Sequence, residues 1–188
     1  MFYRDAASAM LSCIHRESYD PIIDYVGTLG DIDETDWLGN TLLRYAVGYA
    51  NRLWGIRVVQ YLIEIGANPG HKDNHGTTLL MEAARKGGRE NCVSVLLNAG
   101  VDIQSVDGYG YTALRYAQGC DEDGHPYDSG YEKHPQTCEL IRAEIVRRRE
   151  MKVAFAMAGI RRLAEETGMR DFDIGILDMI LKMCEENA

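Results

Sequence analysis

The stretch Asp73-Asn-His-Gly-Thr-Thr-Leu-Leu80 decides the fold, because its pattern of Asp, Gly, Thr and Leu recurs on both sides of it. The matching stretches are Asp36-Trp-Leu-Gly-Asn-Thr-Leu-Leu43 and Asp107-Gly-Tyr-Gly-Tyr-Thr-Ala-Leu114. The three glycines of the pattern are 37 and 34 residues apart. Self-similarity at a period of this length is the sequence signature of a stacked repeat protein.

Each position of the repeated stretch has a physical reason. The glycine permits a positive φ in a tight turn, and the Asp side chain can accept hydrogen bonds from the backbone of that turn. The Thr is expected to begin a short helix and to cap it with its hydroxyl. A second apolar run follows at Val58–Ile63 and Cys92–Leu97, and Gly66 and Gly100 are expected to end these runs in the left-handed conformation. The sequence therefore predicts a turn and a pair of helices, repeated.

Two more units can be found with the same template. A helix over about Tyr3–Arg16, with Ile22–Val26 after it, fits a first unit that caps the array and needs no turn before it. At the other end, Thr137–Ile141 fits the second helix of a fourth unit. The predicted repeats cover about 6–35, 36–72, 73–106 and 107–149, and about three repeats suffice for a stable array.

The repeated pattern resembles the ankyrin repeat, over about residues 6–149. The resemblance implies an all-α repeat solenoid of ankyrin repeats, built of helix-turn-helix units with β-hairpin fingers and closed by C-terminal capping helices. It implies a repeat domain over 1–150 and a C-terminal helical cap or recruitment segment over 151–188. The chain departs from the ankyrin pattern where a His is usual, which removes a recurring Thr–His bond; the residues there are Arg44, Met81 and Arg115.

The spacing between paired helices locates an insertion in the fourth unit, the loop 119–134. Its Asp, Gly and Tyr residues predict an exposed loop, and a loop of this length in a compact array is more often functional than neutral. Cys120, His125, His134 and Cys138 have side chains of the types that bind zinc, but no Cys-x-x-Cys pair is present and Cys138 belongs to a helix core. We therefore predict no metal and no cofactor here, and a solvated loop instead.

The resemblance also implies a binding surface, because partners of ankyrin arrays contact the finger tips and the exposed side of the first helices. The expected ligand is a protein, and the bound surface is the concave one. Trp37, Tyr109 and Tyr111 stand out, because Trp and Tyr often supply binding hot spots and the fold requires no aromatic residue there. The alternative is that the tyrosines cover the backbone of a neighbouring finger.

A basic spot accompanies these aromatic residues. Lys72, Arg85 and Lys86 are cations in an acidic chain, which predicts an acidic segment on the partner. His71 and His75 fit finger-tip contacts better than metal ligands. Carried over position by position, the predicted partner-binding residues are Trp37, Leu38, Asn40, Tyr49, Lys72, Asn74, His75, Thr77, Arg85, Lys86, Tyr109 and Tyr111.

After Glu150 the repeat pattern stops, and two helices separated at Gly168 are expected. The second, about 171–186, is apolar nearly all round, whereas docking on an array needs one apolar stripe. Three roles are open for this segment: a cap, a self-association helix, or the recruitment segment of a ubiquitin-ligase adaptor. The last has a faint resemblance to SOCS-box and F-box-like tails, without their Leu-x-x-x-Cys or Leu-Pro signatures.

Charge and composition exclude several classes of protein. A net charge of −9 disfavours nucleic-acid binding, which needs a basic field, and the run Arg147–Arg149 has acidic neighbours that favour a solvated helix face. Neither a membrane-spanning run nor a signal peptide is expected. Three cysteines within apolar helical patterns predict reduced thiols and a cytoplasmic or nuclear location; they are Cys13, Cys92 and Cys138.

Motifs of common catalytic sites are missing from the sequence, including the phosphate loop, Gly-x-Ser-x-Gly and His-Glu-x-x-His. His75 could act as a base, but the repeat geometry places no nucleophile beside it. Solenoids also lack a closed pocket that excludes water. The sequence therefore predicts a non-catalytic protein–protein interaction scaffold, with a substrate-recognition adaptor of a ubiquitin ligase as the alternative.

Overall fold

The computed structural model describes residues 2–51, 53–86, 89–119 and 133–167. Within these ranges the regular structure is helical, apart from one isolated β-bridge between Lys72 and Thr78. The chain divides into two compact units, Met1–Arg142 and Ala143–Ala188. The helices are α1 (Phe2–Arg16), α2 (Asp20–Val26), α3 (Leu42–Gly48), α4 (Leu53–Glu64), α5 (Leu79–Arg85), α6 (Glu90–Asn98), α7 (Ala113–Gln118) and α8 (Pro135–Thr167).

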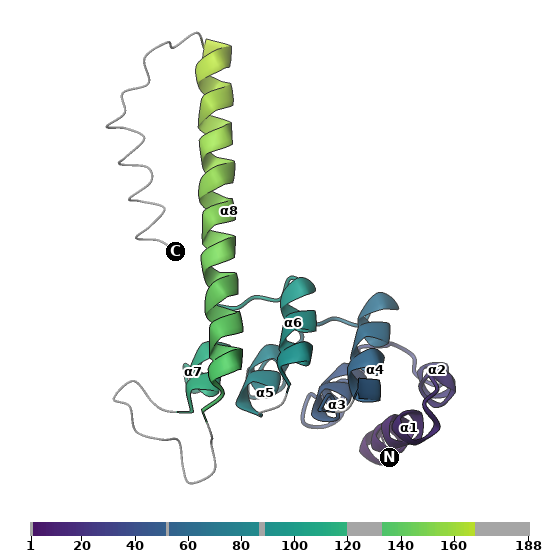
Figure 1. Cartoon of the computed structure of the whole chain (residues 1–188). Coiled ribbons are helices and arrows are strands. Elements are labelled where there is room, and N and C mark those ends of the chain that lie inside the picture. The colour runs from purple at the N-terminus through teal and green to yellow at the C-terminus, as the bar shows by residue number, and fades with distance from the viewer. Residues whose placement is uncertain (1, 52, 87–88, 120–132, 168–188) are drawn as a thin grey trace. The chain divides into compact units, whose positions relative to one another are not determined.

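The helices of the first unit stack in successive pairs, from α1 and α2 through α3 and α4 to α5 and α6, followed by α7 (Figure 1). The first helices form one row, in which α3 packs on α5 and α5 packs on α7. The second helices α4 and α6 pack on each other in a second row. Because each pair contacts its neighbours along the chain, the arrangement is a solenoid. The predicted all-α repeat solenoid is confirmed.

The threonines begin the first helices, as the sequence predicts. Thr41, Thr78 and Thr112 are the N-cap residues of α3, α5 and α7, and each hydroxyl accepts from the amide three residues later at 3.2–3.4 Å. In the third repeat the Thr78 amide also donates to the sulfur of Met81 at 3.3 Å. Met81 thus supplies a side-chain contact to its threonine in the place where the ankyrin pattern has a histidine.

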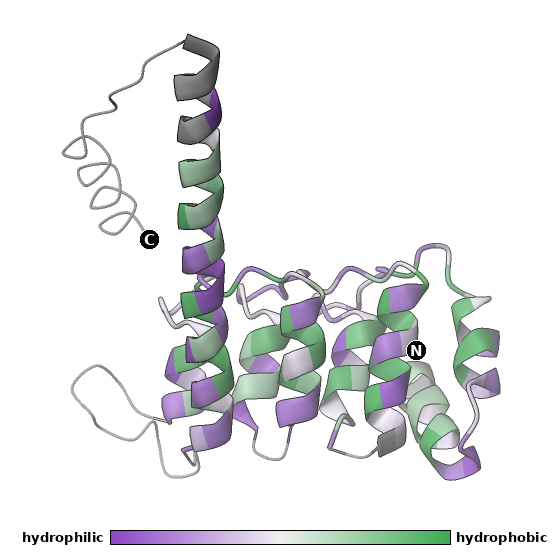
Figure 2. Cartoon of the chain, turned by 45° about the horizontal axis from the view of Figure 1, so that its top comes forward, coloured by the Kyte–Doolittle hydropathy of each residue, from purple (hydrophilic) through white to green (hydrophobic). Residues whose placement is uncertain are grey.

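The core of the first unit lies between the two rows of helices, and along these helices hydrophobic residues alternate with hydrophilic ones (Figure 2). Small residues let the helices approach closely: a Cβ on Gly55 of α4 would clash with the carbonyl of Tyr49. Burying a side chain the size of Leu contributes about 1.5–3 kcal/mol, and several are fully buried in the second and third repeats. The largest buried side chains include Met10, Ile22, Leu42, Leu43, Leu62, Leu79, Leu80, Met81, Leu96 and Ile141.

The fingers are narrow turns, and the described residues do not pair into the strands of a β-hairpin. In each finger the amide of the Asp donates to the carbonyl four residues later, at 3.0–3.1 Å, and the isolated bridge of Lys72 to Thr78 extends one finger by a single pair. The turn is too short for a longer ladder, because Thr78 already caps a helix. The predicted hairpin fingers are therefore present as turns.

Helix α8 is longer than the sequence pattern indicates. It begins at Pro135, a residue suited to the first turn because its missing N–H has no helical partner there, and it buries Thr137, Cys138 and Ile141 in the first unit. It then continues past residue 150, where we expected the repeat domain to end, whereas the division between the units falls at residue 142. The predicted final helix at about 171–186 lies outside the described residues.

In the second unit, α8 carries an acidic residue that holds two arginines. Arg147 donates to Glu144 at 2.6 Å and Arg148 does so at 2.7 Å. The hydrogen bond from Arg147, followed by that from Arg148, lowers the pKa of Glu144 to about 2. Because Arg147 is exposed, this part of the arginine run lies on a solvated helix face with its charge partly balanced.

Candidate functional site

The fingers are shaped by their aspartates. One carboxylate oxygen of Asp73 accepts from the amides of His75 and Thr77, both at 2.9 Å, and Asp36 and Asp107 hold the equivalent amides at 2.8–2.9 Å. The glycine of each turn has a φ of 76–79°. This geometry turns the residues between Asp and Gly outward, so that the finger tips are exposed.

Backbone hydrogen bonds join consecutive fingers. The Asn74 amide donates to the Leu38 carbonyl at 3.2 Å, and the Asn74 side chain donates to the Trp37 carbonyl at 3.1 Å. One finger further on, the Gly108 amide donates to the His75 carbonyl at 2.8 Å. The tips therefore form one continuous edge, in which the side chain of Trp37 is 81% exposed and that of Tyr109 is 73% exposed.

In the second and fourth repeats the other oxygen of the finger aspartate is held by a tyrosine of the same repeat. Tyr45 donates to Asp36, and Tyr116 donates to Asp107 at 2.6 Å. Burial alone would raise the pKa of Asp36, but the hydrogen bonds from Tyr45 and Asn40 hold it below its ordinary value. In both repeats the finger is thus tied to its own first helix.

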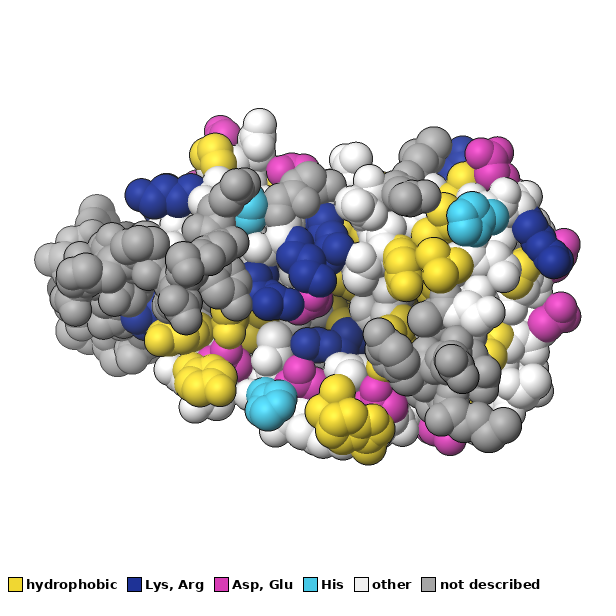
Figure 3. Space-filling view, turned by 90° about the horizontal axis from the view of Figure 1, so that it is seen from below, with side chains coloured by type: hydrophobic (Ala, Val, Ile, Leu, Met, Phe, Trp, Pro, Cys, Tyr) yellow, Lys and Arg dark blue, Asp and Glu magenta, His cyan; other side chains and the backbone are white. Residues whose placement is uncertain are grey.

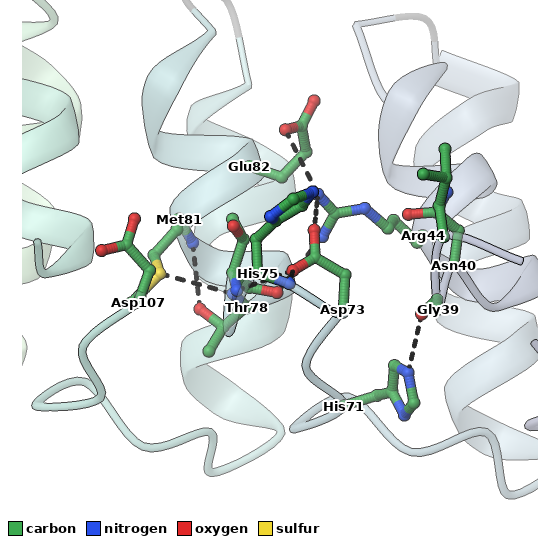
Figure 4. A network of polar contacts seen from close by, with 12 residues as sticks. Gly39, Asn40, Arg44, His71, Asp73, His75, Thr78, Met81, Glu82 and Asp107 are labelled. Atoms are coloured by element: carbon green, nitrogen blue, oxygen red, sulfur yellow. Dashed lines mark hydrogen bonds and ion pairs between the residues drawn. The ribbon is translucent and has the colours of Figure 1, made fainter. Parts of the chain in front are cut away.

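The third repeat is built differently (Figure 4). Its residue at the tyrosine position is Glu82, and the guanidinium of Arg44, from the preceding repeat, pairs with Asp73 at 2.9 Å instead. A second Arg44 nitrogen donates to the Thr77 carbonyl at 3.3 Å. The finger of the third repeat is therefore held by the second repeat rather than by its own first helix.

Glu82 gathers cations around a nearly buried carboxylate. Arg85 and Lys86 each lie 2.8 Å from its oxygens, and Arg44 lies at 3.9 Å. Burial alone would raise the pKa of Glu82, but the hydrogen bond from Lys86 and the charges of Arg85 and Lys86 lower it overall. The Glu82 carboxylate is thus ionised at neutral pH and paired with Arg85 and Lys86. We call Arg44, Glu82, Arg85 and Lys86 the cation cluster.

The cation cluster lies at a concavity of about 240 Å³ on the side of the fingers and first helices. On this face Lys and Arg side chains gather near the middle, and hydrophobic side chains with a histidine lie along one edge (Figure 3). The groove is lined by side chains of the second, third and fourth repeats. They are Arg44, Asp73, His75, Thr77, Met81, Glu82, Arg85, Tyr109 and Tyr116.

The structure brings four of the predicted binding residues to this groove, and they are His75, Thr77, Arg85 and Tyr109. Lys86 joins them through its ion pair with Glu82. Two members of the predicted basic spot, Arg85 and Lys86, thus share Glu82 with a cation that we did not include. Arg44 of α3 accompanies Arg85 and Lys86 on Glu82, whereas Lys72 lies in the finger, where its backbone bridges to Thr78.

The other predicted residues lie around the groove or within the fingers. Asn40 donates to Asp36 at 3.0 Å inside its own finger, and Tyr49 ends helix α3 and is partly buried. The ring of Tyr111 is covered by the guanidinium of Arg115, 4.3 Å from the ring centroid, and stacks near Tyr109. Leu38 and Asn74 join neighbouring fingers, and Trp37 stands exposed at a tip.

Five residues that line the groove were not predicted from the sequence. From the sequence, Arg44 was noted only as a replaced histidine, Asp73 only as a residue of its own turn, and Glu82 not at all. The usable signal was positional, because the residue nine places after the finger aspartate is Tyr45 and Tyr116 in two repeats and Glu82 in the third. The missed residues are Arg44, Asp73, Met81, Glu82 and Tyr116.

Two expectations concern parts of the chain that are only partly described. Of the four residues weighed as zinc ligands, Cys120 and His125 lie outside the described residues, and the ring of His134 contacts the Arg85 carbonyl at 3.2 Å. No group of three or more metal-binding side chains comes together among the residues with described positions. The roles weighed for 151–188 stay predictions. In the described ranges no helix is long and apolar enough to cross a membrane.

Thr-capped helix pairs, stacked in two rows and joined by aspartate-shaped turns, define a repeat solenoid with exposed fingers. Residues 49–125 match the family model described as ankyrin repeats (three copies). The chain therefore contains ankyrin repeats. A stretch of 102 residues, 53% of the chain, is 35% identical to glycerophosphocholine phosphodiesterase gde1 of Schizosaccharomyces pombe. The match covers 8% of that protein.

Proposed function

We propose that the chain is a non-catalytic scaffold that binds a protein partner on the surface formed by its finger tips and first helices. The observation that carries the proposal is the exposure of Trp37 and Tyr109 at the tips of a row of fingers joined by hydrogen bonds. Leaving large aromatic surface in water forgoes the stabilisation of burial, and Trp and Tyr are the residues that most often supply binding energy. A partner that covers both would bury them.

The chemistry of the described residues supports a role without catalysis. Glu82 and Asp73, the carboxylates that line the groove, are occupied by cations, and Glu82 is held ionised, so that it is unsuited to act as a general acid. The described thiols are buried, and burial raises the pKa of Cys92 to about 12, far from a nucleophilic thiolate. The relative named as a phosphodiesterase is matched over too small a share of its length to supply an activity here.

Affinity purification with the full chain as bait tests the proposal. Proteins retained by the wild type are identified by mass spectrometry and compared with those retained by the Trp37→Ala/Tyr109→Ala double variant. We expect a retained protein to be depleted at least about tenfold by the double variant, because each truncated hot spot costs about 2 kcal/mol. An Arg142→Ala variant, changed at an exposed residue of α8 outside the groove, serves as the matched control.

Thermal unfolding separates a binding defect from a folding defect. Because both aromatic side chains are exposed, the double variant should melt near the wild type. If the double variant unfolds at ambient temperature, the two aromatic residues are structural and the proposed surface is wrong. Retention of the same proteins by the wild type and a fully folded double variant contradicts the proposal equally.

A further inference from the structure

In the second unit, helix α8 carries an apolar stripe. Val146, Val153 and Met157 follow one another at spacings of seven and four residues, so they lie on one side of the helix. Met151 and Phe155 are apolar as well, but they lie on another side and are 56% and 84% exposed. This part of α8 therefore has two apolar sides, and the burial of the two can be compared.

The stripe is not covered evenly along its length. Val146 is 53% exposed, whereas Val153 is partly buried, although both are valines on the same side of the same helix. Met157, one turn further on, is also partly buried, unlike Met151 on the other side. The cover on the stripe therefore begins after Val146 and lies toward the C-terminal end of α8.

The sequence that follows α8 needs an apolar surface of this kind. Residues 171–186 lie outside the described residues, and their sequence predicts a helix that is apolar nearly all round. A helix of about 16 residues is barely stable alone in water, and Gly175 weakens this one further. Such a helix must pack on another element. The second compact unit continues from α8 to Ala188, so α8 is the element that this unit offers.

The length of the segment matches the covered part of the stripe. A chain that turns back at Gly168 and runs antiparallel to α8 extends roughly 24 Å along it in about 16 helical residues. This is the length of about the last 16 residues of α8, so the segment passes Val153 and Met157 and stops short of Val146. The reach of the segment thus accounts for the difference in exposure between the two valines.

The charges of the two stretches are complementary. Residues 143–167 of α8 contain six basic and four acidic side chains, which is a net charge of +2. Residues 171–186 contain one basic and five acidic side chains, which is a net charge of −4. Opposite charges on facing surfaces favour their association and orient them as they meet.

We propose that residues 171–186 fold back as a helix onto the Val153 and Met157 side of α8, so that the second unit is a helical hairpin. The occupant of the stripe is thus a segment of the same chain. Met151 and Phe155 stay open, because they lie on a different side of α8. The hairpin concerns the second unit alone and does not depend on the proposed scaffold function.

Hydrogen exchange of the full chain, followed by mass spectrometry, tests the hairpin. The backbone amides of residues 176–184 should exchange at least about tenfold more slowly in the chain than in a synthetic peptide of residues 168–188, because docking protects a helix that is marginal alone. Exchange at the rate of the free peptide would overturn the hairpin, because the segment then packs on nothing.

Two double variants assign the docking to one side of α8. Val153→Asp/Met157→Asp places charges on the stripe and should remove the protection of residues 176–184. Met151→Asp/Phe155→Asp adds the same charges at the same spacing on the exposed side and should keep the protection. Equal loss in both variants rules out this stripe as the docking surface.

A milder pair of variants separates undocking from unfolding of α8. If Val153→Asp/Met157→Asp also speeds the exchange of the amides of α8 itself, the comparison is made with alanine, a strong helix former. Val153→Ala/Met157→Ala should then lower the protection of residues 176–184 in part, and Met151→Ala/Phe155→Ala should leave it unchanged. No difference between these two variants contradicts docking on the stripe.

Dilution distinguishes a segment of the same chain from that of a second copy. The wild type should be monomeric by light scattering, and the protection of residues 176–184 should be the same at every protein concentration, because the contact is intramolecular. A dimer whose protection is lost on dilution places the segment on a second copy of the chain and overturns the hairpin.

Discussion

The Tyr116 hydroxyl donates a 2.6 Å hydrogen bond to the carboxylate of Asp107, which lies nine residues earlier at the start of the finger of the fourth repeat. Tyr45 donates to Asp36 across the same separation. In both cases the other carboxylate oxygen holds two amides of the turn. One aspartate therefore joins the shape of a finger to the first helix of its repeat.

Glu82 breaks this pattern in the third repeat, and the consequence crosses a repeat boundary. Asp73 is paired with Arg44 of the second repeat, so the finger of the third repeat is held by the second repeat. Where the other repeats have a tyrosine, Glu82 instead pairs with Arg85, which lines the groove, and with Lys86. A single change of residue type thus links the stability of the array to the charge of the surface that we propose to bind a partner.

Removing the Tyr116 hydroxyl should weaken the attachment of the fourth repeat's finger to helix α7. We expect Tyr116→Phe to lower the free energy of unfolding by about 1 kcal/mol, the usual net value of an internal hydrogen bond. Urea titration followed by circular dichroism measures the change. Tyr109→Phe removes a hydroxyl from a side chain that is 73% exposed and should leave the midpoint unchanged. Equal losses in the two variants would show that the bond to Asp107 adds nothing.

The close approach of two fingers can be isolated with a pair of glycines. Gly39 and Gly110 share a φ of 79°, but a Cβ on Gly39 would lie 2.6 Å from the side-chain oxygen of Asn74, whereas a Cβ on Gly110 would meet no atom of the described residues within 4 Å. Gly110→Ala should cost about 1–2 kcal/mol, the penalty of the left-handed conformation. Gly39→Ala should cost about 1–3 kcal/mol more, because the fingers must separate. Equal costs in urea titrations would rule out the contact.

The lowered pKa of Glu82 predicts a dependence of stability on pH. The unfolded carboxyl titrates near its ordinary value of 4.5 and the folded one below it, so the unfolded state binds more protons between the two values. The contribution of Glu82 is therefore complete above 4.5 and is lost as the pH falls through the folded pKa. Between about pH 5 and pH 3, wild type should lose more stability than Glu82→Gln. Parallel losses, measured by urea titration at each pH, count against the ion pairs.

The features that depend on one repeat were predictable from the sequence. Asp73, Gly76 and Thr78 form a turn and a cap within a few residues, so the repeated pattern gave their roles directly. The pairing of Arg44 with Asp73 was not predictable in this way, because it joins residues of different repeats. The pairing also depends on Glu82, which stands where a tyrosine binds the finger aspartate in the other repeats. Carrying over family positions one at a time does not compare the repeats in this way.

The sequence pattern also did not predict that helix α8 runs unbroken from Pro135 to Thr167. Loss of the repeat pattern after Glu150 indicates that the residues there no longer pack on a neighbouring repeat. A helix continues, however, until a residue such as proline ends it. The segment beyond Pro135 contains no further proline, and the helix is described as far as Thr167. Periodicity therefore located the finger turns and the starts of the first helices, but it did not predict that the helix of the fourth repeat continues through residue 150.

The face that binds the partner can be located by following backbone amide NMR shifts of the full chain while a partner protein identified by affinity purification is added. We predict that the shifts which change lie in the fingers around Trp37 and Tyr109 and in the first helices α3, α5 and α7. Changes confined to the second helices α4 and α6, with the fingers unaffected, would contradict binding on the proposed surface.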